Sequence, residues 1–198
     1  MPFFKHLDDL SDITDITFND RKRLGPMDKV SQRIMRGKST FTSGEKEMMA
    51  AYVSGLNTSS FCFGSHKSVV EQFGVDPIII EEMVVDIDMA PIDNKLKPIF
   101  KYLKKLTLSP SKLVQEDVYL VIKAGWSEDD LYDAILIGCL FNFYNRLLDG
   151  HGIKGNKAIY RFGGQHLHKK GYSVPWFIGL IKNQIKKSNL KKIKAFNK

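Results

Sequence analysis

The residues best suited to chemistry are a cysteine, a histidine and a glutamate in the first third of the 198-residue chain. Cys62 lies four positions before His66 and fifteen after Glu47. Residues four apart share one face of a helix, so His66 can hold or relay the proton of the Cys62 thiol. If the residues after Thr58 open a helix, its unpaired N–H groups and dipole favour a thiolate at Cys62. The alternative is an inert core cysteine with a histidine at its polar edge.

The segment that precedes this pair carries its own helix signals. Thr42 followed by Glu45 is a capping-box pattern, which predicts a helix over residues 45–56. Its apolar residues recur at three- and four-residue steps, as expected for one buried stripe: Met48, Met49, Tyr52, Val53 and Leu56. A short turn at residues 57–58 brings the next helix back against it. The resulting helical hairpin lets Glu47 reach Cys62 or His66.

Glu47, Ser59, Cys62 and His66 resemble the pattern Glu-x11-Cys-x2-Cys-x3-His of the alkylhydroperoxidase D-like, carboxymuconolactone decarboxylase superfamily, with three of the four positions matched. Further short stretches look like its uncharacterised peroxidase-related branch, and they extend over most of the chain beyond the first forty residues: 45–47, 52–54, 56–57 and 145–146. The resemblance implies an all-α, multi-helix bundle that assembles as a homo-oligomer.

The resemblance also implies roles for these residues. Cys62 takes the place of the peroxidatic cysteine, which passes through a sulfenic acid, and Glu47 and His66 serve as its proton relay. Ser59 replaces the first cysteine, which in the family resolves the sulfenic acid as a disulfide. A serine can hydrogen-bond a thiolate but cannot form a disulfide, so turnover needs an external thiol or a reductant protein.

Composition indicates one ordinary folded domain. A chain of this length, 43% hydrophobic, can bury a full core. We predict a single helical domain over residues 1–198, with an N-terminal extension over about 1–25 and a basic C-terminal helix over about 175–198. Two cysteines allow no disulfide framework, and no long apolar run or secretory start is present. We therefore expect a cytoplasmic protein with no membrane association.

The net charge of +8 is unevenly distributed. Residues 151–198 carry 12 basic and no acidic side chains, whereas residues 1–150 carry 18 basic and 22 acidic ones. The lysines of the tail alternate with apolar residues: Lys182, Lys186, Lys187, Lys191, Lys192, Lys194 and Lys198. This pattern is compatible with an amphipathic helix for nucleic acid or another anionic surface. Because no recognised motif or aromatic stacking platform is present, we predict a solvated terminal helix and no nucleic-acid partner.

Helix signals continue along the chain. Gly25-Pro26 precedes a predicted helix to about Arg36, Asp76-Pro77 opens another, and Ser109-Pro110 opens one ending near Gly125. Ser127 caps a long apolar helix through Leu148. Residues 150–173 contain six of the fifteen glycines, which predicts a loop with at most a short helix before a terminal helix begins at Pro175. No strand signal is present.

Other candidate residues have simpler interpretations. Cys139 lies in an apolar run and is expected in the core, although it can resolve Cys62 if the fold brings the two together. The histidines at 151, 166 and 168 match no closed zinc set, so we predict no metal and no cofactor. Asn142, Asn145 and Arg146 either orient substrate or bridge helices, and bridging is the preferred interpretation.

The hypothesis from sequence is a peroxidase-related, antioxidant oxidoreductase that reduces a hydroperoxide through Cys62 and is regenerated by an external thiol. One alternative is a carboxymuconolactone decarboxylase-like lyase or isomerase, which would use Glu47 and His66 as acid and base. The other is a non-enzymatic nucleic-acid-binding protein that depends on the basic tail.

Overall fold

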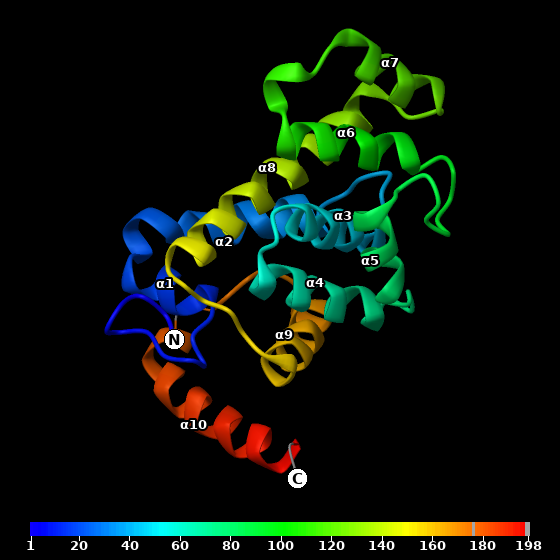
Figure 1. Ribbon diagram of the computed structural model, residues 1–198. Helices are drawn as coiled ribbons and strands as arrows, with labels where there is room; N and C mark the ends of the chain where they lie inside the picture. Colours follow the sequence, from blue (N-terminus) through cyan, green and yellow to red (C-terminus); the bar gives the residue numbers. More distant parts are fainter. Residues whose placement is uncertain (176, 197–198) are drawn as a thin grey trace.

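All the regular structure that the chain shows is helical. The computed structural model describes residues 1–175 and 177–196, and within them it contains ten α-helices, one short 3-10 helix and no strand (Figure 1). In chain order these are α1 (Ile13–Asn19), α2 (Arg21–Arg36), α3 (Ser43–Leu56), α4 (Ser60–Gln72), α5 (Ile78–Val85), α6 (Lys97–Leu108), η1 (Pro110–Lys112), α7 (Gln115–Lys123), α8 (Glu128–Gly150), α9 (Lys157–Lys170) and α10 (Ile178–Phe196). The predicted all-α class is confirmed.

The helical hairpin formed by α3 and α4 is the centre of the molecule. The predicted capping box at its start is present: the Thr42 Oγ1 accepts a hydrogen bond from Glu45 N, and Glu45 Oε2 accepts one from Thr42 N. α3 ends at Leu56, and Thr58 adopts a left-handed conformation (φ 53°) in the turn to α4. Every residue of α3 from Lys46 to Ser54 is buried, so α3 is covered on all sides.

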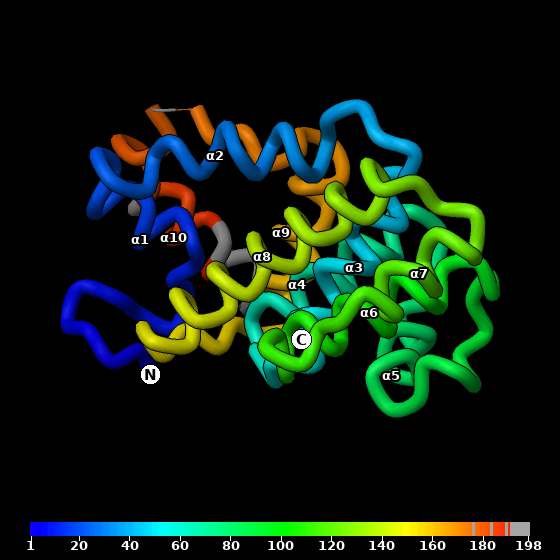
Figure 2. The backbone as a smooth tube through the Cα atoms, turned by 90° about the horizontal axis from the view of Figure 1, so that it is seen from above, coloured from blue at the N-terminus to red at the C-terminus, as the bar shows by residue number. Residues whose placement is uncertain are grey.

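The long helix α8 packs against this hairpin. It starts at the predicted cap, Ser127, which forms a capping box with Asp130: each side chain accepts a hydrogen bond from the other residue's backbone N–H. Its apolar face joins α3 and α6 in the main core, where Tyr52 meets Phe100 edge to face at 5.2 Å. Figure 2 shows α3 in the middle of the molecule, with α8, α6 and α4 around it.

The segment predicted as a glycine-rich loop is instead largely a helix. α9 extends over fourteen residues, from Lys157 to Lys170, with Gly163 and Gly164 in its interior. A Cβ atom at Gly164 would lie 2.9 Å from the backbone carbon of Ser68 on α4. The prediction was wrong because this glycine allows close packing of α9 on α4 rather than a turn.

Two other helix boundaries differ from the sequence prediction. α2 begins at Arg21, where Asp20 caps it, so Pro26 lies inside the helix rather than at its start. The segment after Ser109 is divided into η1 and α7, because Val114 is extended and its N–H is bonded by the Asp117 carboxylate at 2.8 Å.

The two α9 glycines provide a matched test of this packing. We expect Gly164→Ala to lower the free energy of unfolding by about 1–3 kcal/mol, because the added methyl group overlaps the α4 backbone. Gly163→Ala should raise it by up to about 1 kcal/mol, because nothing lies within 4 Å of a Cβ there and alanine favours a helix. Equilibrium urea unfolding measures both, and equal effects would contradict the close approach of α9 to α4.

Candidate active site

A fully buried carboxylate lies at the centre of the site. Glu47 on α3 is 0% exposed, and both of its oxygens are hydrogen-bonded. Oε2 lies 2.7 Å from His66 Nδ1, while Oε1 accepts bonds from Arg36 Nη2 at 2.6 Å and from the Tyr172 hydroxyl at 2.9 Å. The hairpin therefore brings Glu47 to His66, as the sequence predicted.

The surroundings of Glu47 keep it ionised. Burial by itself raises the pKa of a carboxyl group, but the hydrogen bond and charge interaction with His66, together with the Arg36 guanidinium, outweigh it and lower the pKa of Glu47. A carboxylate only accepts hydrogen bonds, so the Nδ1 of His66 is the donor. When the ring is neutral, its single proton is therefore on Nδ1, and Nε2 keeps a free lone pair.

Arg36 and Tyr172 are site residues that the sequence analysis missed. Arg36 ends α2, its guanidinium lies 5.1 Å from the Tyr172 ring centroid, and it donates a second bond to the Leu167 carbonyl at 3.1 Å. Tyr172 follows α9, and its backbone N–H donates to Gln32 Oε1 at 2.6 Å. Burial and the neighbouring Glu47 charge raise the pKa of Tyr172 far above its usual value, so it remains a phenol that donates. No spacing in the sequence indicates contacts over such separations.

Aromatic rings fix the His66 imidazole in its plane. Phe141 on α8 meets it edge to face with ring centroids 4.5 Å apart, and Tyr172 is nearly parallel to it at 6.4 Å. With Nδ1 held by Glu47, the ring has a single orientation. This arrangement is typical of a histidine positioned as a general base.

Cys62 lies in the first turn of α4, as predicted, but it is buried. It is 3% exposed and packs with apolar residues from three regions of the chain: Leu7, Ile16, Phe61, Leu148 and Ile153. Burial, with a smaller contribution from Asp149, raises the pKa of the Cys62 thiol to about 12, although Ser59 opposes the shift. The expectation of a favoured thiolate is wrong for this conformation, because the apolar cover outweighs the helix N-terminus.

Ser59 lies beside this thiol at the N-cap of α4. Its side chain is 0% exposed and makes no cap bond to the helix, and its hydroxyl instead interacts with the Cys62 thiol, which lowers the pKa of that thiol. Its backbone N–H donates to the Ser54 carbonyl at 3.0 Å, which joins the start of α4 to the end of α3. Ser59 therefore places a polar oxygen next to Cys62.

The second cysteine is remote from this cluster. Cys139 is exposed on α8, so the prediction that it lies in the core is wrong. Leu148, which packs with Cys62, is nine residues further along α8, or about 13 Å along the helix axis. Both cysteines are free, and Cys139 is exposed whereas Cys62 is buried, so this conformation contains no disulfide between them.

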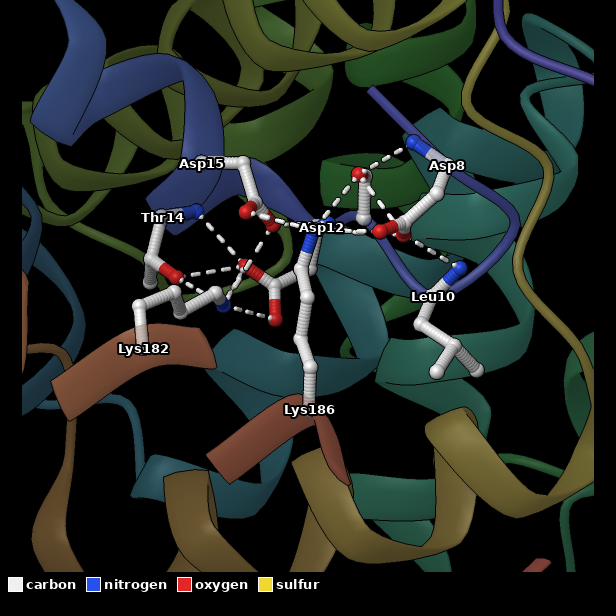
Figure 3. Close-up of polar contacts among 8 residues, drawn as sticks. Asp8, Leu10, Asp12, Thr14, Asp15, Lys182 and Lys186 are labelled. Atoms are coloured by element: carbon white, nitrogen blue, oxygen red, sulfur yellow. Dashed lines mark hydrogen bonds and ion pairs between the residues drawn. The ribbon is translucent and has the colours of Figure 1, made fainter. Parts of the chain in front are cut away.

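Two lysines of the basic tail are paired within the molecule. Figure 3 shows Lys182 and Lys186 extending from α10 toward aspartates of the N-terminal segment. Lys182 Nζ lies 2.8 Å from each Asp12 oxygen, and Lys186 Nζ lies 2.8 Å from Asp15 and 3.1 Å from Asp8. We call these five residues the clasp. The prediction of a solvated terminal helix is wrong at both lysines.

The remaining basic residues of the tail are described only in part. Side chains from Lys191 to Lys194 and the whole of Lys198 lie outside the described residues. None of the described helices is long and apolar enough to cross a membrane, and no cluster of metal-binding side chains occurs among the described residues.

The clasp is intact at neutral pH. Burial of Asp12 alone would raise its pKa, but the charge and hydrogen bonds of Lys182 outweigh this and lower it. A carboxylate with a lowered pKa stabilises the fold above its unfolded value of 3.8, and this stabilisation is lost as the pH falls through the folded value. Because Leu7 and Ile16 flank the clasp aspartates, the clasp holds the segment that covers Cys62.

No protein-family model matches the chain, and no curated protein matches it. Among solved structures, an uncharacterized peroxidase-related protein from Silicibacter sp. TM1040 matches with a TM-score of 0.67 and 22% identity, covering 80% of this chain and 92% of that one. An uncharacterized peroxidase-related protein from Ralstonia eutropha JMP134, an alkylhydroperoxidase AhpD core, matches with a TM-score of 0.65 and 15% identity, covering 82% and 96%. The chain has the AhpD-core fold. The structural resemblance expected from the sequence is confirmed, and at these identities it concerns the fold alone.

Thiol labelling can test whether the clasp limits the accessibility of Cys62. We expect Lys182→Met combined with Lys186→Met to speed iodoacetamide labelling of Cys62 about tenfold, because losing the ion pairs costs about 1–2 kcal/mol of cover stability. Intact-mass measurement with peptide mapping follows both cysteines. In the wild-type protein the exposed Cys139 should react first, and Cys62 should react faster as the pH is raised.

Lys187→Met is the control, because it replaces a lysine by the same residue at an exposed neighbouring position outside the clasp. Equal Cys62 labelling in the control and the double variant would show that the clasp does not hold the cover.

Proposed function

We propose that the protein is a thiol-dependent peroxidase that reduces a hydroperoxide through Cys62. The observation that carries this proposal is the buried Glu47–His66 hydrogen bond, 2.7 Å long, on a hairpin that places Cys62 one helical turn before His66. A histidine oriented in this way by a carboxylate is suited to accept a thiol proton at Nε2. The AhpD-core fold, shared with peroxidase-related proteins, supports the proposal of a thiol-dependent peroxidase.

The reaction begins with transfer of the Cys62 proton to His66 Nε2. The thiolate sulfur then attacks one peroxide oxygen, so an S–O bond forms while the O–O bond breaks. The departing alkoxide takes the proton back from His66 and leaves as an alcohol. Sulfur is oxidised by two electrons to a sulfenic acid, and the hydroperoxide is reduced by the same two electrons.

Regeneration requires thiols from outside the site. Ser59 has no sulfur to offer, and the exposed Cys139 is not paired with the buried Cys62. A first external thiol condenses with the Cys62 sulfenic acid to a mixed disulfide and releases water. A second thiol attacks that disulfide, which frees Cys62 and yields the oxidised reductant.

Reaction also requires Cys62 to become accessible. The thiol is covered by Leu7 and Ile16 of the clasped N-terminal segment. A cavity of about 130 Å³ lies between this segment and residues 152–156, and Ile153 both lines the cavity and packs in the cluster that contains Cys62. Movement of the segment would join this cavity to the thiol, and its size suits a small hydroperoxide.

One observation favours a second candidate function. The Glu47–His66 pair is complete, whereas the pKa of Cys62 is raised to about 12 by burial, which suits acid-base chemistry without redox change. A lyase or isomerase resembling carboxymuconolactone decarboxylase would use the pair in this way. Its activity would survive Cys62→Ser, whereas a thiol peroxidase would lose all turnover.

Trapping of the sulfenic acid tests the proposal. After exposure to hydrogen peroxide and dimedone, we expect one dimedone adduct on Cys62 by intact mass and peptide mapping. Cys139→Ser should retain the adduct and Cys62→Ser should lose it. Glu47→Gln should slow its formation at least about tenfold, because it removes the negative charge and one of the two acceptor oxygens that orient the base. An adduct confined to Cys139 would contradict the peroxidase proposal.

A further inference from the structure

The outward face of α8 carries a row of apolar side chains that remain accessible to solvent. Tyr132 is 60% exposed, Phe143 is 40% exposed, and Cys139 is exposed between them. Leu136 is half-buried on the same face. These residues are spaced four, three and four apart, so they form one seam along the helix. A continuous exposed apolar surface typically marks an interaction site.

The helices on both sides of this seam add exposed apolar side chains. Asn142 bridges α8 to Thr107 of α6 through a 3.2 Å hydrogen bond, as the sequence predicted, and the next residue of α6, Leu108, is 53% exposed. On the α2 side, Val30 is 41% exposed and precedes Ser31, whose hydroxyl is hydrogen-bonded to a tyrosine of α8 at 2.8 Å. Figure 2 shows α8 running between α2 and α6.

The two ends of the seam carry opposite charges. Glu128 lies four residues before Tyr132, and Arg146 lies three residues after Phe143, so both share the face of the seam. Both side chains are exposed, and neither forms an ion pair within the described part of the chain. The Arg146 guanidinium instead donates to Asn142 on its own helix at 2.7 Å. The face is therefore acidic at one end, apolar in the middle and basic at the other end.

We propose that this face binds a second copy of the chain, with the two α8 helices antiparallel across a two-fold axis. A face with acid at one end and base at the other is complementary to its own copy when that copy is reversed, since Glu128 then meets Arg146 of the partner subunit. The midpoint between Glu128 and Arg146 and the midpoint between Tyr132 and Phe143 both fall at positions 137–138. One register therefore pairs the charges and the aromatic rings together.

This arrangement places the two Cys139 side chains close to the axis, about one helical turn apart along it. The surface contains none of the residues assigned to the Cys62 site, so the proposal does not depend on the peroxidase function.

Sedimentation velocity over a concentration series tests the surface. We expect the wild type to form dimers and Phe143→Glu to raise the dissociation constant at least about thirtyfold, because it replaces a central aromatic contact by a charge. Val85→Glu is the control, since it makes the same kind of change at an 83% exposed residue of α5 and should leave the dissociation constant unchanged.

A charge exchange tests the antiparallel register. Arg146→Glu should weaken the dimer about tenfold, because it brings two glutamates together at each end of the seam. Adding Glu128→Arg should restore most of the loss, since the pair is then re-formed with its charges exchanged. A double variant as weak as Arg146→Glu would overturn the register.

Cross-linking locates the axis. In Cys62→Ser, a short bismaleimide should join two copies through Cys139, and Phe143→Glu should abolish this product. In the wild type, iodoacetamide labelling of Cys139 should slow as the protein concentration rises, whereas in dilute solution, where monomers prevail, Cys139 still reacts before Cys62.

Circular dichroism checks the fold of each variant, and Phe143→Ala is the milder second change. A wild type that stays monomeric at every concentration would overturn the proposal, as would an oligomer unaffected by Phe143→Glu. Loss of the fold in both Phe143 variants would assign this ring a structural role and overturn it as well.

Discussion

The buried carboxylate of Glu47 is the constraint on which the rest of the site depends. A charge with no solvent exposure is tolerated only when donors surround it, and Glu47 obtains them from three separate parts of the chain. Arg36 comes from α2, His66 from α4 and Tyr172 from the segment after α9. The hydrogen bonds to this one side chain of α3 therefore hold α2, α4 and the segment after α9 in position around it.

Cys62, the proposed reactive residue, lies in a different environment. His66 faces a charged and aromatic network, whereas Cys62, one turn earlier on the same helix, packs against Leu7 and Ile16. Under the proposed function, this conformation is a resting state, in which the proposed base is oriented and the thiol is covered and protonated. The cover is attached through ion pairs between the N-terminal aspartates and α10, which join these two distant segments of the chain (Figure 3).

Local signals in the sequence were sufficient for the hairpin and for α8. Thr42 and Ser127 begin helices through capping boxes whose chemistry is contained within four residues, and the position of Glu47 opposite His66 follows from the turn between α3 and α4. Gly164 was misread because a glycine that allows close helix packing looks the same in sequence as one that forms a turn. Arg36, Tyr172 and the clasp depend on contacts between distant segments, which no local pattern encodes. The raised pKa of Cys62 was missed for the same reason, since its cover comes from residues more than forty positions away.

The central claim is that Glu47 fixes the imidazole of His66 with its proton on Nδ1 and leaves Nε2 free to act as the base. The most direct measurement is the ¹⁵N chemical shift of each ring nitrogen of His66 in the histidine-labelled protein, at a pH where the ring is neutral. The structure requires a protonated Nδ1 and an unprotonated Nε2 in the wild type, with this preference weakened in Glu47→Gln. A proton on Nε2 in the wild type would contradict the account, because the site would then contain no base for Cys62.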